Sequence, residues 1–321
     1  MKESGRGQAC ANIALTKYWG KRPGTANAPA TPSISLTLDP LRTETTVQMI
    51  DTADDQVVLN GVEATGRPKE RIVWFLDIWR DKGLISGSVF VSSFNSFPTA
   101  AGLASSASGF AALTMALADL AQADLSRREL SRLARLGSGS AARSIFGGIA
   151  AMPLGDNPAA RCVLEAEATP WTMVIAVVDA PEKTVGSTEG MERSRTASPY
   201  YRAWTALAKK DYATVLHGVM HRDFTRVGET MEANMYAMHG CMLATRPSLP
   251  YWSPGTLEVL QEAKVQRSKG LEAYATVDAG AHVALLCRHD DADAVADMLS
   301  LLMDRERVMI CRPAGHAEIP A

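Results

Sequence analysis

The stretch Pro98–Ala121 (PTAAGLASSASGFAALTMALADLA) decides the fold, because in it a loop of small residues runs directly into an apolar helix. In Pro98–Ser108 the small side chains let backbone N–H groups approach an anion, and the helix start adds unpaired N–H donors and a partial positive charge. Ser105 and Ser106 add two hydroxyls. The stretch therefore predicts a phosphate loop before a helix at Gly109–Ala121, although a tight turn packed with small residues would have the same composition.

A second loop of the same kind, Gly137–Arg143 (GSGSAAR), places an arginine one turn inside the following helix. A guanidinium can grip a carboxylate or a phosphate with two parallel hydrogen bonds. The chain contains no Gly-Lys-Ser/Thr and no G-x-G-x-x-G, so neither loop is a Walker A or a dinucleotide fingerprint. Two anion loops predict two phosphorylated ligands, or a nucleotide and an anionic acceptor. The basic segment Lys17–Arg22 (KYWGKR) is a candidate clamp for one of them.

Hydrophobic periodicity predicts strands and helices that alternate toward both ends of the chain. We expect strands at Ser33–Asp39, Thr43–Ile50, Gln56–Asn60, Ser88–Ser93, Gly148–Pro153, Cys162–Glu167, Thr172–Asp179, Ala273–Asp278, Val283–Arg288 and Arg307–Cys311. We expect helices at Pro68–Lys82, Gly109–Ala121, Arg127–Leu136, within Pro199–Thr245, at Pro254–Ser268 and at Ala292–Met303. This order indicates an α/β (α+β) protein with two intimately packed halves that divide near residue 180.

Composition and charge exclude several classes of protein. The 321 residues are 46% hydrophobic and 21% charged, and a net charge of −2 argues against nucleic acid as a partner. No stretch approaches the roughly 18 apolar residues of a membrane span, and the polar N-terminus does not resemble a secretory signal. Five scattered cysteines without C-x-x-C predict reduced thiols in a soluble, cytoplasmic protein, which we expect to form a homodimer.

Two histidines, His217 and His221, have the i,i+4 spacing that can hold a metal ion. Gly218 stands where the metalloprotease signature requires glutamate directly after the first histidine. We therefore interpret the pair as structural and expect no metal ligands among the side chains.

Seven segments together resemble the diphosphomevalonate decarboxylases, a branch of the GHMP small-molecule kinase superfamily. They occur in the family's order and spread over nearly the whole chain: Asn12–Arg22 (NIALTKYWGKR), Pro32–Leu38 (PSISLTL), Pro98–Ala107 (PTAAGLASSA), Gly137–Gly148 (GSGSAARSIFGG), Ser187–Met191 (STEGM), Glu232–His239 (EANMYAMH) and Asp278–Gly280 (DAG). Each segment alone is weak, but all seven in sequence are specific.

The resemblance implies a GHMP-kinase-like two-part fold with an active-site cleft between the halves. Residues 1–180 would form an N-terminal nucleotide- and phosphate-binding α/β domain, and residues 181–321 a C-terminal helical and α/β domain that carries the DAG motif. ATP and Mg²⁺ are the implied cofactors, and a phosphorylated 3-hydroxy acid is the substrate. The family phosphorylates the 3-hydroxyl of a 5-phosphorylated mevalonate, and loss of that phosphate and of CO₂ gives an isopentenyl product.

The resemblance also implies roles for individual residues. The catalytic positions are Asp278, Arg143, Lys17 and Asn12. The substrate positions are Tyr18, Lys21, Arg71, Ser138, Ser140 and Ser187, and the nucleotide loop contains Pro98, Ala101, Gly102, Leu103, Ser105 and Ser106. A tertiary alcohol is a poor nucleophile, so Asp278 would orient or deprotonate it while Lys17 keeps the carboxylate ionised.

Three departures from the family pattern leave the substrate open. The chain reads Ala281-His282 where members usually have Pro-Asn, Gly240-Cys241 where they have Ala-Thr, and Thr188 where some have arginine. We expect each change to fall near the pocket. Diphosphomevalonate is the favoured substrate, with the monophosphate or another 3-hydroxy acid as an alternative. A kinase that stops at phosphorylation is a further hypothesis, and a non-catalytic anion-binding protein is a hypothesis from a different functional class.

Overall fold

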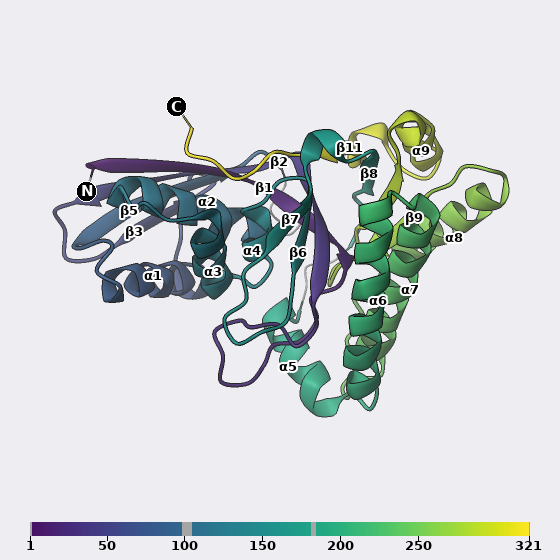
Figure 1. Ribbon diagram of the computed structural model, residues 1–321, viewed down its shortest axis with the longest axis horizontal. Coiled ribbons are helices and arrows are strands. Elements are labelled where there is room, and N and C mark those ends of the chain that lie inside the picture. Colours follow the sequence, from purple (N-terminus) through teal and green to yellow (C-terminus); the bar gives the residue numbers. More distant parts are fainter. Residues whose placement is uncertain (1, 98–104, 181–183, 321) are drawn as a thin grey trace.

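The computed structural model describes residues 2–97, 105–180 and 184–320, so the predicted loop residues Pro98, Ala101, Gly102 and Leu103 lie outside the described part of the chain. The eleven strands of the described residues form one mixed sheet (Figure 1). They follow the order β4 (Val62–Glu63), β3 (Gln56–Leu59), β5 (Ser88–Asn95), β2 (Ser33–Ile50), β11 (Val308–Pro313), β8 (Trp171–Ala176), β10 (Val283–Arg288) and β9 (Tyr274–Val277). Off this path, β1 (Ser4–Thr16) and β6 (Ile149–Met152) pair with β2, and β7 (Arg161–Leu164) pairs with β6. The predicted α/β class is confirmed.

Strand β2 is the central strand of the sheet, and its two halves pair with different strands. Its second half lies between β1 and β5, and its first half lies between β1 and β6. Near the middle, Asp39 and Leu38 pair with β11. The sequence predicted two strands here, Ser33–Asp39 and Thr43–Ile50. That prediction was wrong: the strand is continuous through Pro40, where its hydrogen-bonding partners change.

Four helices pack on the first part of the sheet: α1 (Gly66–Asp81), α2 (Ser105–Ala121), α3 (Arg127–Gly137) and α4 (Ala141–Ser144). Helix α2 is apolar on nearly every side and is buried against β1 and β2. Helix α3 begins at a capping box in which Ser126 and Glu129 satisfy each other's backbone N–H groups. Residues Gly137–Ser140 form the turn from α3 into α4, so the second anion loop lies where the sequence placed it.

The other helices are α5 (Ser187–Ala197), which lies below the middle of the molecule in Figure 1, and α6 (Tyr201–His221), α7 (Phe224–Leu243), α8 (Pro254–Ser268) and α9 (Ala292–Ser300), which lie toward the far end of the sheet. Helices α6 and α7 are packed neighbours along their lengths, and α7 also contacts β9 and β1. Helix α8 begins as predicted at Pro254, after the capping residue Ser253. Among the described residues, no helix is long and apolar enough to cross a membrane.

Sequence periodicity missed helix α5 and the full length of β1. In α5 the buried residues are Gly190, Met191 and Ser194, so the helix has no apolar stripe that a 3.6-residue period could reveal. Helix α9 ends at Ser300 rather than at Met303, because the chain then turns toward β11. The C-terminal segment returns to the start of the chain, where Gln8 and Glu318 exchange backbone hydrogen bonds of 2.9 and 3.0 Å.

Two glycines allow β1 to lie directly on α2. A Cβ atom at Gly7 would stand 2.2 Å from the carbonyl oxygen of Ala112, and one at Gly5 would stand 2.2 Å from that of Ala116. These neighbours are backbone atoms, so they cannot turn aside. The close contact positions α2 against the strand that ends just before Lys17.

We expect Gly7→Ala to destabilise the protein by at least about 1–3 kcal/mol, the usual cost of overpacking a rigid contact. The matched control is Gly240→Ala. A Cβ at Gly240, on the exposed side of α7, meets no atom within 4 Å. That control should stabilise the protein by about 0.5–1 kcal/mol, because alanine favours a helix over glycine. Urea unfolding measures both values, and equal midpoints for the Gly7 variant and wild type would contradict the prediction.

Candidate active site

The centre of the site is an ion pair between Lys17 and Asp278. Lys17 follows the end of β1, and Asp278 follows the end of β9. The Lys17 Nζ atom lies 2.6 Å from Oδ1 of Asp278, and the two side chains are 1% and 38% exposed. Burial lowers the pKa of Lys17, and the charge of Asp278 opposes that shift. The carboxylate can therefore meet a ligand from the open side while the buried ammonium supports it from behind.

A buried guanidinium lies beside this pair. Arg143 on α4 donates from Nη1 to Ser33 Oγ at 2.6 Å, from Nε to Ser35 Oγ at 2.9 Å, and from Nη2 to Asn12 Oδ1 at 3.1 Å. Burial lowers the pKa of Arg143 to about 10, and the nearby Asp278 raises it. Arginine carries five N–H donors. These contacts within the described residues leave one N–H on each terminal nitrogen for a bidentate ligand.

Asn12 fixes the orientation of Arg143. Its carbonyl oxygen accepts from the guanidinium, and its amide nitrogen donates to Ser144 Oγ at 2.7 Å and to the Ser140 carbonyl at 3.2 Å. Both Asn12 and Arg143 are almost completely buried. Strand β1 therefore supplies the polar residue that holds the arginine in place, in addition to leading to Lys17.

The two predicted anion loops meet through serine hydroxyls. Ser106, in the first turn of α2, lies 3.3 Å from Ser138, and Ser138 lies 3.3 Å from Ser140. Tyr18 borders the same loop: its hydroxyl donates to the carbonyl of Asn27 at 2.9 Å, and its ring lies where a Cβ at Gly139 would stand. The structure thus brings together two segments that the sequence could identify only separately.

Lys21 and the start of α5 form another side of the site. The Lys21 Nζ atom donates to Thr188 Oγ1 at 3.0 Å, and the half-buried Ser187 precedes Thr188 at the first position of α5. Partial burial, together with the positive charge of Arg71, lowers the pKa of Lys21 to about 8. Arg71 donates to the carbonyl of Gly137 at 3.3 Å, so the cation from α1 borders the serine loop.

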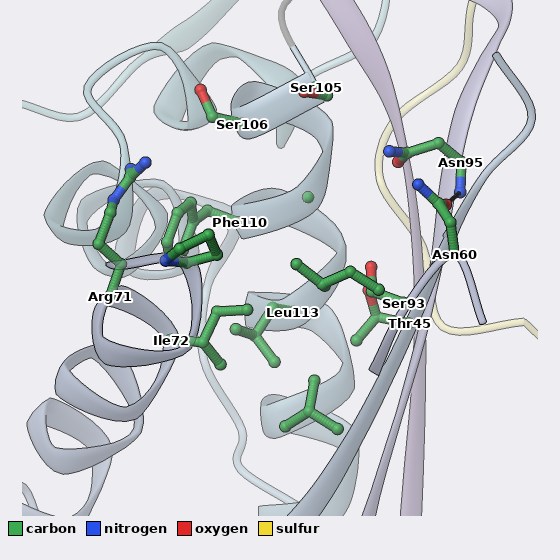
Figure 2. A pocket seen from close by; sticks show the side chains of 14 residues that line it. Thr45, Asn60, Arg71, Ile72, Ser93, Asn95, Ser105, Ser106, Phe110 and Leu113 are labelled. Atoms are coloured by element: carbon green, nitrogen blue, oxygen red, sulfur yellow. Dashed lines mark hydrogen bonds between the residues drawn. The ribbon is translucent and has the colours of Figure 1, made fainter. Parts of the chain in front are cut away.

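A pocket of about 180 Å³ opens next to the first anion loop, between α1, α2 and the strands (Figure 2). Ile72, Phe110 and Leu113 provide apolar surface, and Ser105 and Ser106 lie at the helix start. Across the pocket lie polar side chains from the sheet side: Thr45, Asn60, Ser93 and Asn95. An apolar slot with polar groups on one edge suits a flat heteroaromatic ring.

The structure brings the nominated Lys17, Asp278, Arg143 and Asn12 together at one centre, and Ser140 of the serine loop accepts from Asn12. Arg71, Ser105 and Ser106 line the adjoining pocket, where Arg71 and Ser106 also contact the serine loop. Sequence reasoning did not name Ser33 and Ser35 as site residues. Their signal was present, because residues two apart on a strand point to the same face. No sequence motif identified Asn60 and Phe110 as pocket residues, because only tertiary packing brings them to the same pocket.

The departures from the family pattern lie in different environments. Gly240 is exposed, and a Cβ there would meet no atom within 4 Å. Helix periodicity turns it outward, one residue after the buried His239. Thr188 contacts Lys21, and Ala281 and His282 follow Asp278 closely in the chain. Those positions remain candidates for tuning the substrate.

Two histidine environments differ sharply. His217 and His221 stack on the exposed side of α6, with ring centroids 4.0 Å apart, and the described residues contain no cluster of three or more potential metal ligands. His239 is buried under Trp252, and burial lowers its pKa to about 3. His239 is therefore neutral near pH 7.

Two family models match most of the chain. The model described as the diphosphomevalonate decarboxylase-like N-terminal domain matches residues 9–164. The model described as the mevalonate 5-diphosphate decarboxylase C-terminal domain matches residues 173–317. A diphosphomevalonate decarboxylase of Aspergillus fumigatus is 34% identical over 91% of this chain and 78% of its own length.

Solved structures agree with these matches. The mevalonate diphosphate decarboxylase of Staphylococcus aureus superposes with a TM-score of 0.95 at 36% identity, over 100% of this chain and 99% of that one. A complex described as MDDEF with MVAPP, AMPPCP and magnesium has a TM-score of 0.94 at 37% identity, over 99% and 98% of the two chains.

We expect anion binding to weaken as the pH rises through about 8, because Lys21 then loses its proton. The cationic form, which attracts the anion, exists below that pKa. The affinity for inorganic pyrophosphate should fall by up to about tenfold per pH unit above it, since one pKa unit corresponds to 1.36 kcal/mol. Isothermal titration from pH 7 to 9 measures this.

The matched control is Lys21→Arg, whose side chain stays charged from pH 7 to 9. Because the titration of pyrophosphate itself affects both proteins equally, it drops out of the ratio of their affinities. The ratio of the two affinities should change with pH. A constant ratio would show that Lys21 does not titrate in this range or does not contact the anion.

Proposed function

We propose that this chain, which belongs to the diphosphomevalonate decarboxylase family, is an ATP-dependent decarboxylase. It would convert 5-diphosphomevalonate and ATP into isopentenyl diphosphate, ADP, phosphate and CO₂. The carrying observation is the Lys17–Asp278 pair, which stands beside Arg143 and the two joined anion loops. This arrangement offers one carboxylate to an alcohol and several donors to anionic groups. The match of the two family models over residues 9–164 and 173–317 supports the assignment.

In the first step, Asp278 would orient the tertiary 3-hydroxyl and accept its proton as the oxygen attacks the γ-phosphorus of ATP. The P–O bond to ADP breaks, and a phosphate ester forms at C3. The Lys17 ammonium, 2.6 Å from Asp278, keeps the carboxylate ionised and able to act as a base. Phosphorylation turns a poor leaving group into a competent one.

In the second step, the C3–O bond breaks and phosphate leaves with the bonding electrons. Positive charge develops at C3, and the C1–C2 bond supplies the electron pair that forms the C2–C3 double bond as CO₂ departs. Arg143 would hold the carboxylate through its two remaining terminal N–H groups, since Ser33, Ser35 and Asn12 fix the guanidinium plane. The fixed plane would keep the departing carboxylate aligned with the breaking C–O bond.

The nucleotide would lie with its base in the pocket of Figure 2 and its phosphates toward Ser105 and Ser106. Mg²⁺ commonly keeps several waters and is held largely by substrate phosphates, with few protein ligands. The hydroxyls of Ser105, Ser106 and Ser138 fit such a site. When bound, Mg²⁺ would neutralise charge on the phosphates.

The 5-diphosphate would face Tyr18, Lys21, Ser138, Ser140, Ser187 and Arg71. A neutral tail would leave several of these donors unpaired, which costs free energy in a partly buried site. The division near residue 180, the cytoplasmic location and the homodimer remain proposals. The break between the two family models supports the first, and five free cysteines, four of them buried, fit a reducing compartment.

We expect Asp278→Asn to lower kcat by about 10²–10⁴-fold, the usual contribution of a general base. ATP-analogue binding should be unchanged, because the nucleotide pocket lies elsewhere. Since the substitution also removes the charged partner of the buried Lys17, urea unfolding must accompany the kinetics. A folded variant that keeps more than about a tenth of the wild-type rate would remove Asp278 from the chemistry.

A substrate panel tests the proposed function itself. The 5-diphosphate, the 5-monophosphate and free mevalonate are each mixed with MgATP, and ADP, phosphate and CO₂ are measured together. We expect equal amounts of all three products with the 5-diphosphate, and a kcat/KM at least about tenfold lower for the monophosphate because it leaves charge-assisted contacts unmade. ADP without CO₂ would instead identify a kinase. A preference for the monophosphate would overturn the substrate assignment and leave the reaction type intact.

A further inference from the structure

We propose that Asn234 and Asp211 are positioning residues that set the place at which Lys17 meets Asp278. Asn234 lies on α7 and Asp211 on α6, and neither belongs to the pocket lining or the anion loops. Both are buried, at 0% and 9% exposure. The proposal rests on the proposed function, because turnover is its main measure.

The main chain of Lys17 is held by side chains. Its N–H donates to Asn234 Oδ1 at 2.8 Å, and its carbonyl accepts from Thr31 Oγ1 at 3.1 Å. Its ammonium also donates to the carbonyl of Ala14 at 3.1 Å. The strand β1 ends at Thr16, so Asn234 replaces the ladder hydrogen bond that a further strand residue would have made.

Asp211 fixes the orientation of Asn234. The Asn234 amide nitrogen donates to Asp211 Oδ2 at 2.8 Å. A carboxylate accepts hydrogen bonds and a backbone N–H donates, so only one orientation of the amide satisfies Asp211 and Lys17 together. A relay of two hydrogen bonds thus connects α6 through α7 to the residue that carries the catalytic ammonium.

The same helix, α7, holds the Asp278 side of the ion pair. His239 Nε2 lies 3.2 Å from the carbonyl of Val277, the residue before Asp278. Glu232 Oε1 accepts from the N–H of Ala275 in β9 at 3.2 Å. Helix α7 therefore contacts the backbone near both members of the pair, through Asn234 on the Lys17 side and through Glu232 on the β9 side.

The position of Lys17 matters because its side chain is 1% exposed and cannot follow a displaced partner through solvent. Displacement of a catalytic group by about 1 Å can cost about 10²-fold in rate. The relay would therefore act on kcat, through Lys17, and leave nucleotide binding unchanged.

Two variants test the relay: Asn234→Asp, and the double variant that exchanges the side chains of residues 234 and 211. Asn234→Asp still accepts from Lys17 but places a carboxylate against Asp211, and two carboxylates at this distance cannot both be ionised. We expect kcat to fall by about 10²-fold with an unchanged KM for ATP. The loss should be larger at pH 8 than at pH 6, because a shared proton holds the pair together at the lower pH.

The double variant Asn234→Asp/Asp211→Asn restores a donor opposite the carboxylate, so kcat should recover about tenfold or more relative to the single variant. Asp211→Ala removes the acceptor that orients the Asn234 amide and should also lower kcat, whereas Asp211→Asn keeps an amide oxygen as acceptor and should lower it less. Full activity of Asn234→Asp, or no recovery in a folded double variant, would overturn the proposal.

The matched control is Val215→Ala, which weakens the buried packing of α6 one turn beyond Asp211 without touching the relay. It should lower stability and leave kcat unchanged. If it lowers kcat as much as Asn234→Asp does, the effect is general packing and the relay is rejected.

A measurement independent of turnover separates this proposal from the proposed function. In protein labelled with ¹⁵N-lysine, the Lys17 amide should exchange its hydrogen faster in Asn234→Ala than in wild type. Unchanged exchange would reject the relay even if the wild-type enzyme decarboxylates. If the wild type is inactive but the Lys17 amide still exchanges faster in Asn234→Ala than in wild type, the proposed function is rejected and the hydrogen bond is kept.

Discussion

The buried ammonium of Lys17 is the constraint on which the rest of the structure depends. A cation at 1% exposure requires a carboxylate and further hydrogen bonds, or burial would remove its proton. The carboxylate comes from Asp278, 261 residues later in the chain. Although β1 and β9 are not partners in the sheet, Thr276 Oγ1 in β9 donates to the carbonyl of Ala14 in β1 at 3.4 Å. The two halves of the chain must therefore meet at this point for either residue to be satisfied.

Strand β1 links this pair to the anion loops. The same strand supplies Asn12, which orients Arg143, and it lies against α2, whose first turn presents Ser106 to the serine loop. A displacement of β1 would thus disturb the Lys17–Asp278 pair, the contacts of Arg143 and the first turn of α2 at once. At Gly5 and Gly7, β1 lies so close to α2 that no Cβ atom would fit. This close packing helps to hold β1 in place, although both glycines are far from the Lys17–Asp278 pair.

The sequence predicted most elements because their periodicity is local. Small residues before a helix carry a direct physical signal and indicated two anion loops, but only the second, Gly137–Ser140, lies wholly among the described residues. The sequence missed α5, whose buried residues are small or few, and it divided β2 at Pro40. The resemblance nominated Lys17, Asp278 and Arg143, but their contacts depend on tertiary packing. Asn234 shows the limit most clearly, since an asparagine in a helix acquires its role only from the strand end that lies opposite.

The site concentrates positive charge in a protein whose net charge is −2. Asp278 neutralises Lys17, but Arg143 is bound by the neutral side chains of Ser33, Ser35 and Asn12, so its charge is buried without a full counterion. Burial lowers the pKa of Arg143 to about 10, which reflects the cost of keeping the charged form away from water. An anionic ligand would supply the missing counterion. In the free protein, hydroxyl and amide groups hold the Arg143 cation in place but do not neutralise it. The cost of removing this cation from water is therefore already met before an anionic ligand binds, which favours binding of that ligand.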